Sequence, residues 1–115
     1  MDAVAVQTEE LIAAVRNSRD YRRYEKSKEL LRQRPELKKK VDEYRIRNFQ
    51  MQQAGRDLYD ESDEMLREFD STLQDPLAAE YLDSESAVCR MVQRVFNYIS
   101  KSLAVDLPGT RESRQ

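Results

Sequence analysis

The sequence contains no histidine and no tryptophan, and only one cysteine, two glycines and three prolines occur among its 115 residues. Histidine is the commonest general base and metal ligand in proteins, so its absence removes the usual centre of both chemistries. The single Cys89 cannot form a disulfide within the chain, and alone it cannot hold a zinc ion or an iron–sulfur cluster. We therefore expect no catalytic, cofactor-binding or metal-binding residues, and a protein that is not an enzyme.

Long apolar runs are also missing. No stretch approaches the ~18 consecutive apolar residues of a membrane span. The first residues, with an acid at Asp2, lack the basic-then-apolar layout of a secretory signal. We therefore expect a cytoplasmic protein without a membrane span.

The composition itself is that of long, solvated helices. Charged residues make up 37% of the chain and hydrophobic residues 39%, and the helix-breaking residues glycine and proline are few. The length allows one modest core. We expect an all-α fold, in which residues 1–105 form a single helical domain and residues 106–115 a disordered tail.

Two short helices are expected before residue 35. The first should run from Val6 or Thr8 to Asn17, with residues 1–5 frayed. Residues 18–20 offer a cap and a break, and a second helix should then extend to about Gln33. Pro35 disfavours helical geometry at the residue before it and suits the first turn of a new helix.

One long central helix is predicted from Pro35 to about Leu73. Its apolar or small residues recur at alternating intervals of four and three, at positions 37, 41, 44, 48, 51, 55, 58, 62, 65, 69 and 73. Gly55 costs about 1 kcal/mol relative to alanine in a helix interior and could mark a break. Because no proline accompanies it, we favour a continuous or gently bent helix.

A C-terminal helix should begin with Asp75 as its N-cap and Pro76 in its first turn. A polar interruption at residues 83–85 offers a kink or a fresh cap. The helix then carries the most apolar face of the chain, which we expect to be buried as the main packing partner of the long helix. This face consists of Val88, Cys89, Val92, Val95, Phe96, Ile99 and Leu103.

The apolar or small positions of the long helix form a stripe along it, and this stripe is self-complementary about Gly55. An antiparallel crossing of two copies at this residue would pair large residues with large ones and bases with acids, as a two-fold dimer requires. The sequence therefore predicts a homodimer or higher oligomer; the alternative is that the stripe packs wholly on the last helix of its own chain. The predicted self-association residues are Asn48, Met51, Gly55, Leu58 and Ser62.

Charge is unevenly distributed along the chain. Residues 1–56 contain 14 bases and 9 acids, whereas residues 57–115 contain 6 bases and 13 acids. The basic half could bind an anionic partner, or it could pair with the acidic half. RNA binding through residues 16–47 would require tyrosines that are free to stack, although their helical spacing places them in the core. The candidate partner-binding residues are Arg19, Arg22, Arg23, Lys38, Lys39 and Lys40.

Four segments, taken in order, resemble the YlbF/YmcA family of small bacterial regulators. They are residues 18–24 (SRDYRRY), residues 34–37 (RPEL), residues 49–52 (FQMQ), and residues 75–77 (DPL) followed by Tyr81, Leu82 and Glu85. The resemblance implies an all-α, cytoplasmic, oligomeric protein. It also implies a role in competence, sporulation and biofilm formation, in a complex that assists the endoribonuclease RNase Y. Family members with iron–sulfur clusters use additional cysteines, which this chain lacks.

Together these observations predict a regulatory adaptor that binds other proteins through helical surfaces. The alternative is an RNA-binding accessory protein that uses the basic face around residues 16–47.

Overall fold

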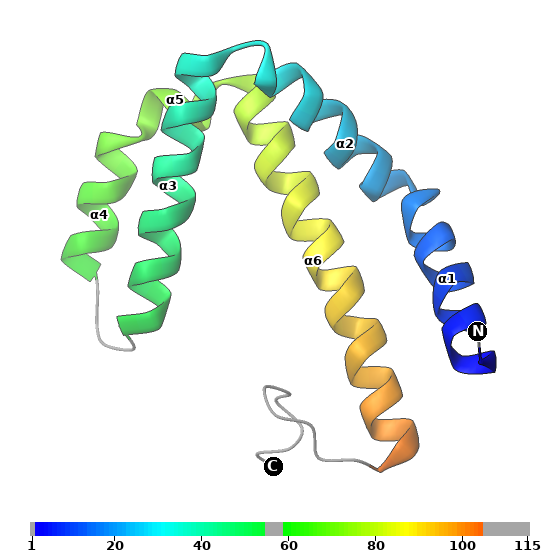
Figure 1. Ribbon diagram of the computed structural model, residues 1–115. Helices are drawn as coiled ribbons and strands as arrows, with labels where there is room; N and C mark the ends of the chain where they lie inside the picture. Colours follow the sequence, from blue (N-terminus) through cyan, green and yellow to red (C-terminus); the bar gives the residue numbers. More distant parts are fainter. Residues whose placement is uncertain (1, 55–58, 105–115) are drawn as a thin grey trace.

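A computed structural model describes residues 2–54 and 59–104 of the chain (Figure 1). Every regular element within these residues is a helix, so the all-α prediction is confirmed. Gly55, Leu58 and the predicted tail lie outside the described residues. The helices are α1 (Ala3–Arg16), α2 (Arg19–Arg32), α3 (Pro35–Ala54), α4 (Tyr59–Glu68), α5 (Asp70–Gln74) and α6 (Pro76–Leu103).

The described helices form an open V (Figure 1). In one limb, α1 and α2 run along α6. The other limb consists of α3 and α4, which we call the α3–α4 arm. The limbs meet where α2 turns into α3 and where α5 leads into α6. The Cα radius of gyration is 17.4 Å, well above the ~13 Å of a compact domain of about this size.

Local sequence signals explain most helix boundaries. Ser18 caps α2 by accepting a hydrogen bond from the Tyr21 amide at 3.2 Å, and Pro35 opens α3. The Asp75 carboxylate caps α6 by accepting from the Leu77 amide at 2.9 Å, with Pro76 next to it in the first turn. These starts were predicted correctly.

The start of α1 was predicted wrongly. The helix begins at Ala3, because the Asp2 carboxylate accepts a hydrogen bond from the Ala5 amide at 2.7 Å. Aspartate is a favoured N-cap residue, and its negative charge lies at the positive end of the helix dipole. Residues 3–5 are therefore helical and not frayed.

The main core lies near the apex of the V, between α2, α3 and α6. Ser27 on α2 and Ser84 on α6 are 2% and 0% exposed, and their hydroxyl oxygens lie 3.5 Å apart. Each hydroxyl also bonds to a carbonyl of its own helix, so neither of these buried donors is left unsatisfied. Such small side chains let the two helices approach closely. The buried apolar residues of this core are Leu31, Val41, Ala78 and Tyr81.

The prediction of one long central helix is wrong, because α3 and α4 are separate helices that pack against each other. The Tyr44 and Phe69 rings meet edge to face with centroids 5.6 Å apart, and Arg47 forms an ion pair with Glu68. In a straight helix, residues 47 and 68 would be about 30 Å apart. The stripe has therefore been folded back on itself, and its large residues and opposite charges pair within one chain.

The predicted burial of the last helix is also wrong in part. The helix α6 continues without interruption through residues 83–85, and it packs mainly on α2, not on α3. Val92 and Phe96 are 52% and 40% exposed, and Cys89 is exposed as well. The reason is geometric, since α3 diverges from α6 and does not follow it to its C-terminal half (Figure 1).

Candidate protein-interaction groove

Three arginines connect the first half of α6 to the rest of the molecule. Arg34, at the turn between α2 and α3, donates two hydrogen bonds to the Asp75 carboxylate, at 3.0 and 3.3 Å. Arg45 on α3 donates to Glu85, and Arg23 on α2 lies between these two points. Together these three arginines hold α2, α3 and the turn between them against the first half of α6.

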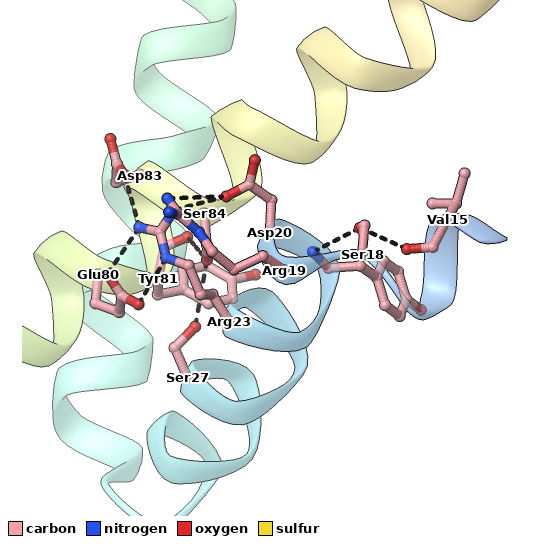
Figure 2. Close-up of polar contacts among 11 residues, drawn as sticks. Val15, Ser18, Arg19, Asp20, Arg23, Ser27, Glu80, Tyr81, Asp83 and Ser84 are labelled. Carbon is pink, nitrogen blue, oxygen red and sulfur yellow. Dashed lines mark hydrogen bonds and ion pairs between the residues drawn. The ribbon is translucent and has the colours of Figure 1, made fainter. Parts of the chain in front are cut away.

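Arg23 is the most heavily bonded of the three (Figure 2). Its guanidinium donates to Glu80 at 2.8 and 3.0 Å, to Asp83 at 2.7 Å and to Asp20 at 2.9 Å. The hydrogen bonds from Arg23 hold the pKa of Glu80 and the pKa of Asp83 below their usual range, and the same bonds raise the pKa of Arg23. The cluster clamps α2 to α6.

The predicted partner-binding bases do not form one surface. Arg23 is occupied by the clamp, whereas Arg19 and Arg22 lie exposed near the same end of α2. The three lysines lie on α3, beyond the far end of α2 and about 20 Å away along that helix. Two of them pair locally: Lys38 with Asp42 at 2.8 Å, and Lys40 with Glu43 at 3.8 Å. Lys39 is exposed.

The tyrosines of the basic region are half-buried and contact one another and the core. The rings of Tyr21 and Tyr24 have centroids 6.0 Å apart, and Tyr24 stacks on the buried Tyr81 at 5.6 Å. Base stacking needs a free aromatic face, so these contacts do not favour the RNA-binding interpretation.

A groove opens where α3 and α6 diverge, and we call it the V groove. Its volume is about 620 Å³. Phe49 on α3 is 61% exposed at its edge, and Leu82 on α6 is half-buried in its wall. The lining combines apolar surface with amides and hydroxyls, as protein-binding surfaces commonly do. The lining residues are Tyr44, Arg45, Asn48, Phe49, Gln52, Leu73, Ala79, Leu82, Glu85, Ser86 and Cys89.

The groove side of α6 remains apolar beyond the groove itself. Phe96 and Leu103 follow Cys89 at intervals of seven residues, so they lie on the same side of α6 as Cys89. They are 40% and 66% exposed. Exposed apolar residues of this kind make this side of α6 a candidate interaction surface.

A second apolar cleft lies between α1 and α6. Its volume is about 310 Å³, and it is lined on one side by Leu11, Ile12 and Val15 and on the other by Val92 and Val95. The cleft exists because α1 makes few contacts with α6 along its length. The exposed apolar surface of α6 therefore lies between two open spaces, the V groove on one side and this cleft on the other.

The predicted self-association residues are only partly described. Asn48 lines the V groove, and Met51 is half-buried on the same helix. The Gly55 crossing presupposed one continuous helix, so its premise is removed by the separate α3 and α4. The sequence-based reasoning missed the V groove altogether. The apolar face of α6 that was expected to be buried contributes only Cys89 to the lining of the groove.

The described residues contain no cluster of His, Cys, Asp or Glu that could hold a metal ion. Across the same part of the chain, none of the helices has the length and apolar character needed to cross a bilayer.

Comparison with known protein families places nearly the whole chain in one of them. Residues 4–104 match the model of a family described as "Control of competence regulator ComK, YlbF/YmcA". Neither the curated proteins nor the solved structures contain a match to this chain. The matched range spans nearly all of the six described helices.

Proposed function

Because the chain belongs to the YlbF/YmcA family, we propose that it is a non-enzymatic cytoplasmic adaptor that regulates through contacts between its helices and those of other polypeptides. The family description supports the regulatory part of this proposal. The resemblance in sequence further suggests the process, which is RNase Y-dependent mRNA processing in the control of competence and related developmental states.

The observation that carries the proposal is the V groove. It places an exposed aromatic ring, Phe49, opposite an apolar helix face that includes Leu82 and Cys89. An amphipathic helix binds a groove of this kind by inserting apolar residues at intervals of three and four. The ion pairs of Arg45 with Glu85 and of Arg34 with Asp75 link the walls of the groove near the apex.

The adaptor role can be tested with purified components. The full chain would be titrated into RNase Y of the same organism with a structured mRNA substrate. We expect the pattern or rate of cleavage to change, and Phe49→Asp to reduce this effect while Tyr98→Asp, at a 75% exposed aromatic residue outside the groove, does not. The chain alone should cleave nothing.

A gel-shift titration with the same RNA separates the adaptor from the RNA-binding alternative. An adaptor gives no shift at any salt concentration. Binding through several bases gives a shift that weakens steeply as salt rises, and that result, with unchanged RNase Y activity, would overturn the proposal.

A further inference from the structure

The cleft between α1 and α6 continues along α1 toward the N-terminus of that helix, where α1 runs beside the C-terminal half of α6 (Figure 1). It is followed by a second hollow of about 390 Å³, and Leu11 lines both spaces. They therefore form one elongated trough between the two helices, which we call the α1 trough. The lining residues of the second hollow are Ala3, Val4, Gln7, Thr8, Leu11 and Ile99.

The walls of the α1 trough are apolar along their length. On α1, Val4, Leu11 and Val15 recur at intervals of seven and four residues, so they share one side of the helix. On α6, Val92 and Ile99 form the opposite wall and are 52% and 44% exposed. No residue of α1 is fully buried, although a helix of 14 residues is marginal in isolation. The described residues therefore leave the apolar side of α1 largely uncovered.

Charge is confined to one end of the trough. Among the described residues that line it, only Arg16, at the C-terminal end of α1, is charged. Arg16 forms no ion pair within the described part of the chain. Tyr21 lines the same end and donates its hydroxyl hydrogen to Glu25 at 2.8 Å. This hydrogen bond raises the pKa of Tyr21 and Arg16 opposes the effect, so the guanidinium lies close to the hydroxyl.

We propose that the α1 trough binds a free long-chain carboxylate, with its alkyl chain between α1 and α6 and its carboxylate at Arg16. An alkyl chain has no hydrogen-bonding groups that apolar walls would leave unsatisfied. From Val4 to Arg16 the trough extends about 18 Å along α1, and its two spaces are of the size of small-molecule pockets. The proposal goes beyond the adaptor role, because the trough and the V groove share no lining residue.

The competing occupant is a helix of another polypeptide. A helix is about 10–12 Å across with its side chains, which is wider than spaces of about 310 and 390 Å³ between two helices of one chain admit. It would also need polar residues along the rim of the trough, whereas the described lining has one charged residue at one end. A single alkyl chain with one anionic head matches both the shape and the charge.

Isothermal titration calorimetry of the full chain with octanoate, decanoate and dodecanoate, each below its micelle-forming concentration, tests the alkyl part. We expect one molecule bound per chain. The affinity should rise by up to about fourfold for each added methylene, because each methylene moves from water to the apolar walls. Absence of saturable dodecanoate binding, or an affinity that does not change with chain length, would overturn the proposal.

Decan-1-ol has the chain of decanoate without the charge, so it isolates the contribution of Arg16. The carboxylate should bind about two- to fivefold more tightly than the alcohol, as for a partly solvated ion pair. Arg16→Gln should abolish this difference and leave the affinity for the alcohol unchanged. Arg22→Gln, at an exposed arginine outside the lining, should preserve the difference. Equal binding of the two compounds by the wild type would refute the placement of the carboxylate.

Leu11→Gln places an amide in the middle of the trough and should weaken the binding of decanoate and of decan-1-ol alike. Leu30→Gln is the matched control, because Leu30 on α2 lies outside the lining and is 43% exposed, against 39% for Leu11. Circular dichroism should show both variants to be helical. Binding of decanoate by Leu11→Gln as tightly as by the wild type would show that the ligand is not in the trough.

Hydrogen exchange locates the ligand without any substitution. Bound decanoate should slow amide exchange in α1, because the ligand holds this helix against α6. Protection confined to α3 would place the ligand at the V groove and overturn the proposal. Vesicles of phosphatidylglycerol separate a free carboxylate from a membrane surface. The chain should not sediment with them, and sedimentation without any binding of free decanoate would identify the membrane as the ligand and refute the proposal.

Discussion

Arg45 on α3 donates to Glu85 on α6 through two nitrogens, with Nη2 2.6 Å from Oε2 and Nε 3.0 Å from Oε1. The guanidinium also lies 5.9 Å from the centroid of the Tyr81 ring. This pair joins the two limbs of the V at the head of the groove, where both residues belong to the lining. The distance between the two walls of the groove therefore depends on the contact of Arg45 with Glu85, which the sequence alone does not reveal.

Replacing Arg45 with methionine should lower the free energy of unfolding by about 0.2–1 kcal/mol, because the pair is partly solvated and bidentate. Glu85→Gln should cost a similar amount, and the double variant less than the sum of the two. A double-mutant cycle from urea denaturation measures this coupling. Lys39→Gln, on the same helix, is the control. If it lowered the free energy of unfolding as much as Arg45→Met does, the Arg45–Glu85 pair would make no specific contribution to stability.

Ser84 should tolerate only small side chains. Its hydroxyl oxygen lies 3.5 Å from that of Ser27 across the close contact of α2 and α6, so Ser84→Leu would force these helices apart at a cost of about 1–3 kcal/mol or more. Ser84→Ala should be tolerated much better. Thermal melting of both variants, with exposed Ser102→Leu as the control, checks this; an unchanged melting temperature for Ser84→Leu would show that the helices are not closely packed there.

Phe69 and Phe96 should respond very differently to truncation. Phe69 is 0% exposed and packs on Tyr44, so Phe69→Ala should destabilise the protein by about 3–5 kcal/mol. Phe96 is 40% exposed, so Phe96→Ala should cost far less. Denaturation should be followed at low protein concentration, where self-association does not contribute. Similar losses of unfolding free energy at the two positions would mean that the apolar face of α6 is part of the core.

Acid should weaken the contact between α2 and α6. Arg23 lowers the pKa of Glu80 and the pKa of Asp83, so the folded state binds these protons less readily than the unfolded state does. The resulting stability is present above the ordinary carboxyl range of about 4, and it is lost as pH falls through and below that range.

The matched variant for this pH effect is Arg23→Gln. It should make the decline in melting temperature below about pH 4 shallower. Arg22→Gln, one residue away and exposed, should keep the wild-type profile. Identical acid profiles for Arg23→Gln and the wild type would contradict the role assigned to the clamp.

Asp75 has two separable roles, because it caps α6 and also accepts from Arg34. Asp75→Asn should retain most of the cap and lose the ion pair, whereas Asp75→Ala should lose both. We expect Asp75→Ala to cost about 1–2 kcal/mol and Asp75→Asn less. Urea denaturation of both variants tests the order, and equal costs would mean that capping contributes little.

The sequence by itself determined the helical class and most of the helix boundaries. Capping side chains and prolines act within a few residues of their own position, so Ser18, Pro35, Asp75 and Pro76 could be read without knowing the fold. The family assignment likewise followed from the order of short segments, and the match over residues 4–104 confirms it. The absence of histidine and the scarcity of cysteine narrowed the chemistry that the chain could perform, whatever its fold.

Only the tertiary structure decided where the amphipathic faces go. The stripe of residues 37–73 fits a partner helix equally well whether that partner is another copy or its own second half, because heptad spacing specifies a face and not its occupant. The contacts of Tyr44 with Phe69 and of Arg47 with Glu68 show that the chain folds back on itself. For the same reason, the apolar face of α6 looked like a core in the sequence, and its exposure follows from the divergence of α3 from α6, which no local pattern encodes.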